Sequence, residues 1–245
     1  MNITNILIAQ PEPTGTSPYT ELIEKHKLII DFVPFIHVES LSTKEFRAQR
    51  IDIMQHTAVI FTARTAVDMF FNLCEELRIT IPETMKYFCI TESIANYLQK
   101  YIVYRKRKIF FGNGTVDSVI EKIGVKHRGE LFLLVLAEGY KPEIPKCFDK
   151  AKIKNSKAVF YRTVVSNLKH VDLKRYDLLV FYSPAEVKSF VENFPKFKQA
   201  KTLIASFGAA SAQELKDNKL TVAIEAPTPQ APSIAKALDI FLSKK

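Results

Sequence analysis

Residues 177–194 combine residue types that could bind an anion. An uninterrupted apolar run ends at Phe181, as in a strand covered on both faces, and apolar residues then recur with helical spacing up to Phe194. Between them, Ser183 and Pro184 suit the N-cap and the first position of a helix. Open α/β sheets bind ligands at the carboxyl ends of strands, where helix N-termini favour negative charge. The pattern therefore predicts an anion-binding strand, turn and helix.

A second copy of this unit occurs in residues 58–74, with its polar turn at residues 62–65. The apolar helix positions of the two copies are separated by 120 residues. A further pair, residues 87–98 and 203–215, is separated by 117 residues. The nearly equal offsets indicate two α/β halves of similar build. The alternative is that any two amphipathic units of this kind look alike.

These turns would be positioned by more strands than one short sheet needs and by helices between them. The expected helices include one that begins at Ser17, one from the capping box at Ser42 to about residue 54, one capped by Thr115 and one from Ser211. We expect two α/β domains, the first formed by residues 1–36 and 164–245 and the second by the inserted residues 37–163. Pro34 interrupts an apolar, β-branched run, which suits a strand that leaves one sheet for another body. Two extended crossings, near Pro34 and near Tyr161, would form a two-stranded hinge, and a cleft lined by the turns would lie between the domains.

The amino-acid composition of the chain limits the classes of function that it can have. The net charge of +9 and pI near 9.3 favour anionic partners, although surface lysines for solubility give the same balance. Three scattered cysteines and five isolated histidines predict neither disulfides nor a metal site, and a cytoplasmic setting follows. No apolar run is long enough to cross a membrane. Residues 105–108 are four consecutive cationic residues. Such a run indicates either a patch that binds nucleic acid or, more commonly, an edge strand exposed to solvent.

Several short motifs together resemble the uroporphyrinogen-III synthase family along nearly the whole chain. No single motif is specific, because each is only a strand-to-helix turn, but their order and spacing are typical of the family. The motifs are VIFT at residues 59–62, a VGxxTAxxL-like helix start at 90–98, a VYRT-like strand at 160–163, an FxSP turn at 181–184, an IGxxTAxxL-like turn at 207–215 and an AxxPTxxxLxxAL-like ending at 223–238.

The resemblance implies two flavodoxin-like domains, each a parallel sheet with helices on both faces, joined by a two-stranded linker. The implied reaction closes linear hydroxymethylbilane to uroporphyrinogen III through a spiro intermediate, with loss of water and inversion of ring D, and without metal or cofactor. Tyr161 matches the strand tyrosine proposed in the family as proton donor, although such a tyrosine is usually a packing residue. The residues expected to contact the substrate are Thr62, Ala63, Arg64, Ser93, Ser183, Pro184, Gly208, Ala209, Ala210 and Ser211.

The sequence departs from the family pattern mainly in the inserted domain. Gln10 stands where the family usually has arginine, and Ala63 replaces a serine. Thr91 and Ile94 replace the glycine and threonine of one turn, for which Ser93 or Arg64 could compensate. These departures leave open a non-catalytic two-domain binder of an anionic tetrapyrrole or similar metabolite. We expect a monomer that could receive its substrate from hydroxymethylbilane synthase and that binds neither membrane nor nucleic acid.

Overall fold

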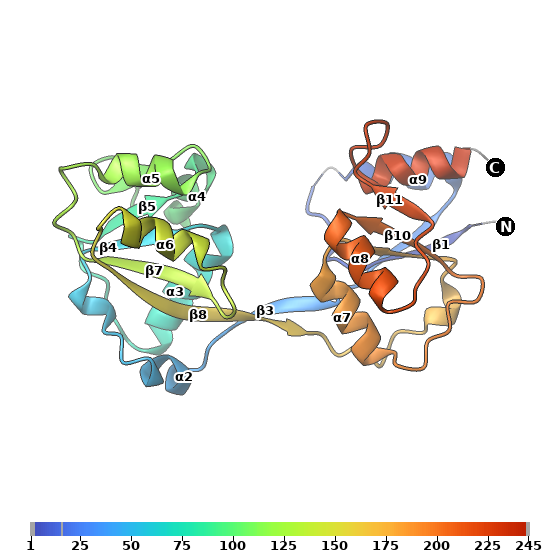
Figure 1. Cartoon of the computed structure of the whole chain (residues 1–245), viewed down its shortest axis with the longest axis horizontal. Coiled ribbons are helices and arrows are strands. Elements are labelled where there is room, and N and C mark those ends of the chain that lie inside the picture. The colour runs from blue at the N-terminus through green and yellow to red at the C-terminus, as the bar shows by residue number, and fades with distance from the viewer. Residues whose placement is uncertain (1–2, 16, 244–245) are drawn as a thin grey trace. The chain divides into compact units, whose positions relative to one another are not determined.

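The computed structural model describes residues 3–15 and 17–243, and the chain divides into two compact units (Figure 1). Unit 1 comprises Met1–His37 and Val164–Lys245, and unit 2 comprises Val38–Thr163. Each unit has its own sheet, and the chain passes from one unit to the other within strand β3 and again within strand β8.

Unit 1 contains a five-stranded sheet in which every neighbouring pair of strands is parallel. Its order is β11-β10-β9-β1-β2, which is 2-1-3-4-5 when the strands are counted along the chain, the flavodoxin-like order. The strands are β1 (Asn5–Ile8), β2 (Ile29–Phe32), β9 (Leu178–Phe181), β10 (Leu203–Phe207) and β11 (Ile224–Ala226). The helices are α1 (Pro18–His26), α7 (Pro184–Asn193), α8 (Ala209–Asp217) and α9 (Ile234–Ser243), with a short 3-10 helix at Leu173–Arg175.

The six-stranded sheet has the order β3-β8-β7-β4-β5-β6, and its pairs from β8 to β6 are parallel. Without β3, the order is 3-2-1-4-5 along the chain, which differs from that of unit 1. The strands are β3 (Ile36–Ser40), β4 (Ala58–Phe61), β5 (Lys86–Cys89), β6 (Ile109–Phe111), β7 (Phe132–Ala137) and β8 (Asn155–Val165). The helices are α2 (Thr43–Ala48), α3 (Arg64–Glu76), α4 (Glu92–Tyr97), α5 (Val116–Ile123) and α6 (Glu143–Lys150), with 3-10 helices at Ile53–Gln55 and Leu98–Lys100.

The two units contain similar runs of strands and helices, but the chain forms the parts of the two sheets in a different order. The run β4-α3-β5-α4-β6 grows from the middle of one sheet to its edge, as β9-α7-β10-α8-β11 does in the other. The remaining pair, β7 and β8, follows this run in unit 2, whereas the corresponding β1 and β2 precede it in unit 1. The parallel α/β class predicted from the sequence is confirmed, and the flavodoxin-like strand order holds for unit 1.

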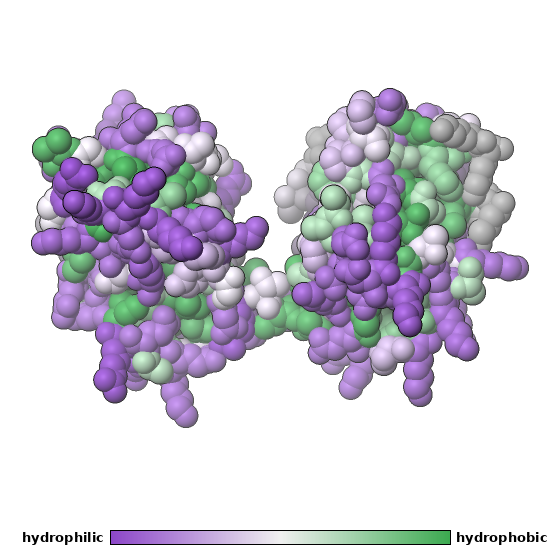
Figure 2. All heavy atoms as spheres, viewed as in Figure 1, coloured by the Kyte–Doolittle hydropathy of each residue, from purple (hydrophilic) through white to green (hydrophobic). Residues whose placement is uncertain are grey.

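Apolar cores lie on both faces of each sheet, because the central strands are buried throughout. Phe70 and Phe160 belong to one core of unit 2, and Phe88 and Phe132 belong to the other. In unit 1 the two cores are formed around Val180 and its neighbours on one face and around Leu179 on the other. The visible face of unit 2 is mainly hydrophilic, and that of unit 1 shows both hydrophilic and hydrophobic residues (Figure 2). Among the described residues, no helix is long and apolar enough to span a membrane.

Several elements differ from the sequence-based expectations. The helix expected from the capping box at Ser42 to about residue 54 ends at Ala48, because Arg50 adopts a left-handed backbone with φ 54°. Helix α6 was not predicted, because its lysines and Pro145 leave only a short stripe of apolar residues with helical spacing. Pro145 is tolerated because it lies in the first turn of the helix.

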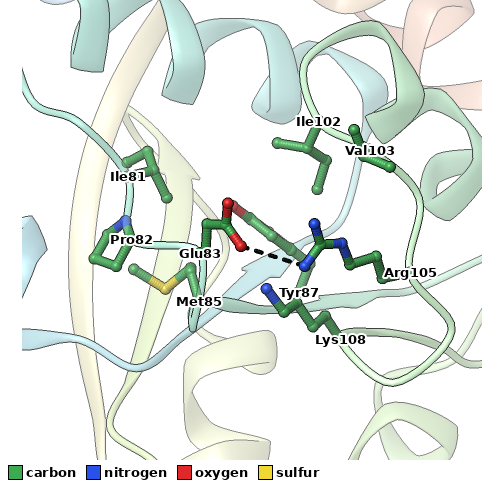
Figure 3. Close-up of a pocket in the computed structure, with 9 residues that line it drawn as sticks. All are labelled: Ile81, Pro82, Glu83, Met85, Tyr87, Ile102, Val103, Arg105 and Lys108. Carbon is green, nitrogen blue, oxygen red and sulfur yellow. Dashed lines mark hydrogen bonds and ion pairs between the residues drawn. The ribbon is translucent and has the colours of Figure 1, made fainter.

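The four cations at residues 105–108 lie before the edge strand β6, not on it, because the carbonyl of Arg105 accepts hydrogen bonds from the amides of Lys108 and Ile109. Arg105 pairs with Glu83 at 3.2 Å beside a cavity of about 180 Å³ (Figure 3). This cavity adjoins the residues that precede β5 and β6, so it lies at the sheet edge opposite the turns expected to bind substrate.

The helix α2 contains an acidic group that should make stability depend on pH. The Glu45 carboxylate accepts hydrogen bonds from the Ser42 hydroxyl (2.6 Å), from the Arg162 guanidinium and from the Ser42 amide (2.9 Å), which lower its pKa from 4.5 to about 2. A lowered folded-state pKa stabilises the protein above pH 4.5, and this contribution is lost as the pH falls through 2.

We therefore expect Glu45→Gln to lower the urea midpoint at pH 7, with the difference from the parent shrinking as the pH falls toward 2. Circular dichroism during urea titrations from pH 2 to 7 measures this. Glu121→Gln, on the exposed surface of α5, is the control and should follow the parent curve. A Glu45→Gln difference that is the same at every pH contradicts the assignment.

Candidate functional site

The carboxyl ends of the strands bring the sequence-predicted residues together at one edge of each sheet. In unit 1 the connections from β1 and β9 lead in opposite directions across the sheet, so the gap between these strands is a topological switch point. In unit 2 the corresponding pair is β4 and β7. Ligands of open α/β sheets bind at such points. Ser183 follows β9, and Thr62, which is half-buried, follows β4.

The turn at Ser183 uses most of its own hydrogen-bonding groups. The Ser183 hydroxyl accepts a hydrogen bond from the Glu186 amide at 3.3 Å, and the Glu186 carboxylate accepts from the amides of Tyr182 (2.6 Å) and Ser183 (3.3 Å). Pro184 is the first helical residue and has no N–H. The groups left for a substrate are the Ala185 amide and the hydroxyl proton of Ser183.

Glu186 is a buried acid beneath this turn, with 3% of its surface exposed. Burial raises the pKa of Glu186, although hydrogen bonds from the Tyr182 amide and the Gln10 side chain oppose the rise. Gln10, which stands where the family usually has arginine, therefore contacts the acid without adding a charge.

The start of α8 differs from the sequence-based expectation. The helix begins at Ala209 with Gly208 as its N-cap, whereas Ser211 was expected to begin it. Gly208 has φ +85°, which a glycine adopts readily, and its amide donates to the Ala226 carbonyl at 2.6 Å. Ala209 and Ala210 are exposed, but Ser211 is 1% exposed. No side chain caps this helix, so the turn presents backbone amides and not the Ser211 hydroxyl.

In unit 2, Arg64 and Ser93 meet. Arg64 is the first residue of α3, and its Nη2 donates to the Ser93 hydroxyl, in the first turn of α4, at 2.7 Å. Both side chains are exposed. Ala63 is the N-cap of α3 and offers no side-chain oxygen, so the first amides of α3 have no side-chain cap. Thr91, in contrast, caps α4 by accepting from the Ile94 amide at 3.4 Å.

A polar cluster that the sequence did not predict lies beside Arg64. The Arg64 guanidinium lies 5.5 Å from the centre of the Tyr97 ring. Asp68 accepts hydrogen bonds from Tyr97 and Lys100, each at 2.9 Å, and from Tyr101. Burial alone would raise the pKa of Asp68, but these hydrogen bonds outweigh it and hold the pKa below its ordinary value. The cluster fixes the ring against which Arg64 rests.

Tyr161 lies beside the carboxyl end of β7, opposite Ala137. The pairing of β7 with β8 is irregular between Leu136 and Ala137, and such a bulge reverses which face a side chain occupies. As a result, Tyr161 packs against the same core as Phe160, the residue before it. Tyr161 is half-buried, and burial raises its pKa. Among the described residues, no hydrogen-bond partner of its hydroxyl is found, so the proton is free to be donated to a ligand.

No group of three or more histidine, cysteine, aspartate or glutamate side chains within residues 3–15 and 17–243 is arranged to hold a metal ion. Backbone amides, hydroxyl groups and the Arg64 guanidinium can bind carboxylates, and Tyr161 provides a neutral phenol.

Comparison with known proteins gave one family and several similar structures. The family model described as Uroporphyrinogen-III synthase HemD matches residues 17–236 of the 245-residue chain. The uroporphyrinogen-III synthetase of Helicobacter pylori 26695 is 16% identical, with a TM-score of 0.61, and the match covers 99% of this chain and 100% of that chain. A mutant uroporphyrinogen III synthase of the extremely thermophilic bacterium Thermus thermophilus is also 16% identical, with a TM-score of 0.53 and the same coverage. No curated protein sequence matched.

Proposed function

Because the chain belongs to the uroporphyrinogen-III synthase family, we propose that it is a lyase that closes hydroxymethylbilane to uroporphyrinogen III with inversion of ring D and loss of water. The family is one of heme biosynthesis enzymes, and its model spans nearly the whole chain. That match is the observation that carries the proposal. The turns at the carboxyl ends of the strands support it, because they offer donors suited to the acetate and propionate groups of such a substrate.

The carboxylates of the substrate would be held by two kinds of donor. Backbone amides at the starts of α3 and α8 have no side-chain cap and can donate hydrogen bonds to an anion without displacing a capping side chain. The Arg64 guanidinium, with the Ser93 hydroxyl beside it, supplies a charged donor in unit 2. This pair offsets the loss of the serine at position 63 and of the threonine at position 94.

Ring closure then requires mainly that the two ends of the linear molecule meet, which is a matter of proximity. Tyr161 would donate its phenolic proton to the terminal hydroxyl, so that the carbon–oxygen bond breaks and water leaves. Closure through the spiro intermediate would invert ring D, and the proton that the macrocycle then releases from a ring carbon would return to the phenolate, so that one water is lost overall. The raised pKa keeps Tyr161 protonated at neutral pH, as this role requires.

The decisive experiment is an isomer assay. Purified protein incubated with freshly prepared hydroxymethylbilane should yield the type III isomer, separated by chromatography after oxidation. Formation of the type I isomer alone, at the rate seen without protein, would refute the proposal. Tight tetrapyrrole binding by calorimetry without any type III isomer would point instead to the non-catalytic binder.

Arg64→Ala is expected to raise the KM for hydroxymethylbilane about 10-fold, because a charge-assisted hydrogen bond contributes on the order of 1.5 kcal/mol. Arg64→Lys should recover only part of this loss, since an ammonium lacks the planar pair of donors. The control is Arg47→Ala, which removes an exposed charge from α2 in the same unit. Equal KM values for the Arg64→Ala and Arg47→Ala variants would mean that Arg64 acts only through net charge.

A further inference from the structure

A cavity of about 280 Å³ lies in unit 1 beside the switch point between β1 and β9. It is lined by aromatic side chains from four separate segments, by isoleucines from β1 and α9, and by prolines from the loop after β1. None of the residues expected from the family motifs to contact substrate lines it. The residues used below are Tyr19, Phe32, Tyr182, Phe207, Ile8 and Ile234.

The walls of this cavity are mainly aromatic and apolar side chains, and none of the lining residues is charged. The rings of Tyr182 and Phe207 are 5.6 Å apart at 34°, and those of Tyr19 and Phe32 are 5.5 Å apart at 72°. The hydroxyl groups of Tyr19 and Tyr182 are hydrogen-bonded to each other, so each hydroxyl has a hydrogen-bond partner. Burial raises the pKa of both tyrosines, which are therefore neutral at physiological pH. Such walls suit an uncharged aromatic ring and exclude a carboxylate.

The rim of the cavity, in contrast, is formed by turns that can bind anions. Tyr182 directly precedes Ser183, and Phe207 directly precedes Gly208, the N-cap of α8, a helix without a side-chain cap. The first turn of α9 lines the cavity as well, with Ser233 accepting from the Lys236 amide at 3.2 Å. A ring inside the cavity would therefore carry its carboxylate substituents at the amides of the rim.

We propose that this cavity holds one pyrrole ring of the linear tetrapyrrole substrate, with the acetate and propionate groups of that ring at the rim. The proposal rests on the proposed function and assigns a ring site to it. The volume lies just below the range of about 300–1,000 Å³ for pockets that enclose a drug-sized ligand, so the cavity takes one ring and not the whole substrate. A ring anchored in this way limits the motion of the chain whose ends must meet.

The binding test uses porphobilinogen, a single pyrrole with one acetate and one propionate group. In protein labelled with ¹³C at the isoleucine methyl groups, titration with porphobilinogen should shift the signals of Ile8 and Ile234, which line the cavity. The signal of Ile123, in a core of unit 2, serves as the reference. Absence of binding at millimolar porphobilinogen, or binding that shifts other signals and leaves Ile8 and Ile234 unchanged, overturns the proposal.

The functional test replaces an aromatic ring by an aliphatic side chain of similar size. Phe207→Leu should raise the KM for hydroxymethylbilane about 3- to 10-fold and abolish the Ile8 and Ile234 shifts, because the ring-face contact is lost. The matched control is Phe197→Leu, a half-buried phenylalanine of unit 1 outside this cavity, which should keep the parent KM.

The two hypotheses fail in different ways. If the parent protein makes the type III isomer but Phe207→Leu keeps the parent KM, the ring site is wrong and the proposed function stands. If the parent protein makes no type III isomer, the proposed function is wrong whatever porphobilinogen does.

Discussion

Tyr161→Phe is expected to lower the turnover number for hydroxymethylbilane about 100-fold, because a positioned general acid contributes roughly 10²- to 10⁴-fold. The ring of Tyr161 packs against the core that contains Phe160, and the phenylalanine ring preserves that packing. Its hydroxyl has no partner among the described residues, so no internal hydrogen bond is lost. The melting temperature should therefore stay close to that of the parent while turnover falls.

The matched control is Tyr140→Phe, which removes a phenol from the loop after β7 at the same sheet edge. This variant should keep more than half of the parent turnover. The pH profile offers a second readout, because burial raises the pKa of Tyr161 above its ordinary value, so the parent turnover should fall only at strongly alkaline pH. If Tyr161→Phe retains most of the turnover, another group donates the proton, and Tyr161 is a packing residue.

Local signals were enough to place most turns of this protein. Ser17, Ser183 and Thr115 each cap a helix that begins at the next residue, because a short hydroxyl side chain reaches the free amides of the first turn. The apolar run that ends at Phe181 likewise placed the end of β9, whereas the cations expected on an edge strand precede β6. The start of α8 was missed because its cap is a glycine, whose backbone freedom leaves no side-chain signal.

The contacts that shape the candidate site could not be predicted in the same way, since they join segments distant in sequence. Arg64 meets Ser93 only because β4 and β5 are neighbours and bring the starts of α3 and α4 together. The bulge that turns Tyr161 toward the core depends on the pairing of β8 with β7. The different strand orders of the two units could not be predicted for the same reason. The local runs of the units are alike, but β7 and β8 follow the shared run along the chain, whereas β1 and β2 precede it.

A buried ring on α3, that of Phe70, shows how strongly the site depends on the core. Phe70 is 0% exposed and lies 5.5 Å from the ring centres of both Phe61 and Phe160. Phe70→Ala is expected to destabilise unit 2 by about 3–5 kcal/mol, because it removes a fully buried ring and leaves a cavity. The neighbouring Phe71 is only half-buried and stacks on Tyr101 at 4.5 Å, so Phe71→Ala should cost less.

Hydrogen exchange measures this difference within one unit, which matters because the chain has two units and no tryptophan to report their unfolding separately. In the Phe70→Ala variant, the amides of Ile60 and Phe88, in the paired strands β4 and β5, should exchange at least 100-fold faster, while those of β9 keep their protection. The same variant should raise the KM for hydroxymethylbilane, since α3 carries Arg64. Equal acceleration by Phe71→Ala would show that the ring of Phe70 is no more important to the core than the half-buried ring of its neighbour.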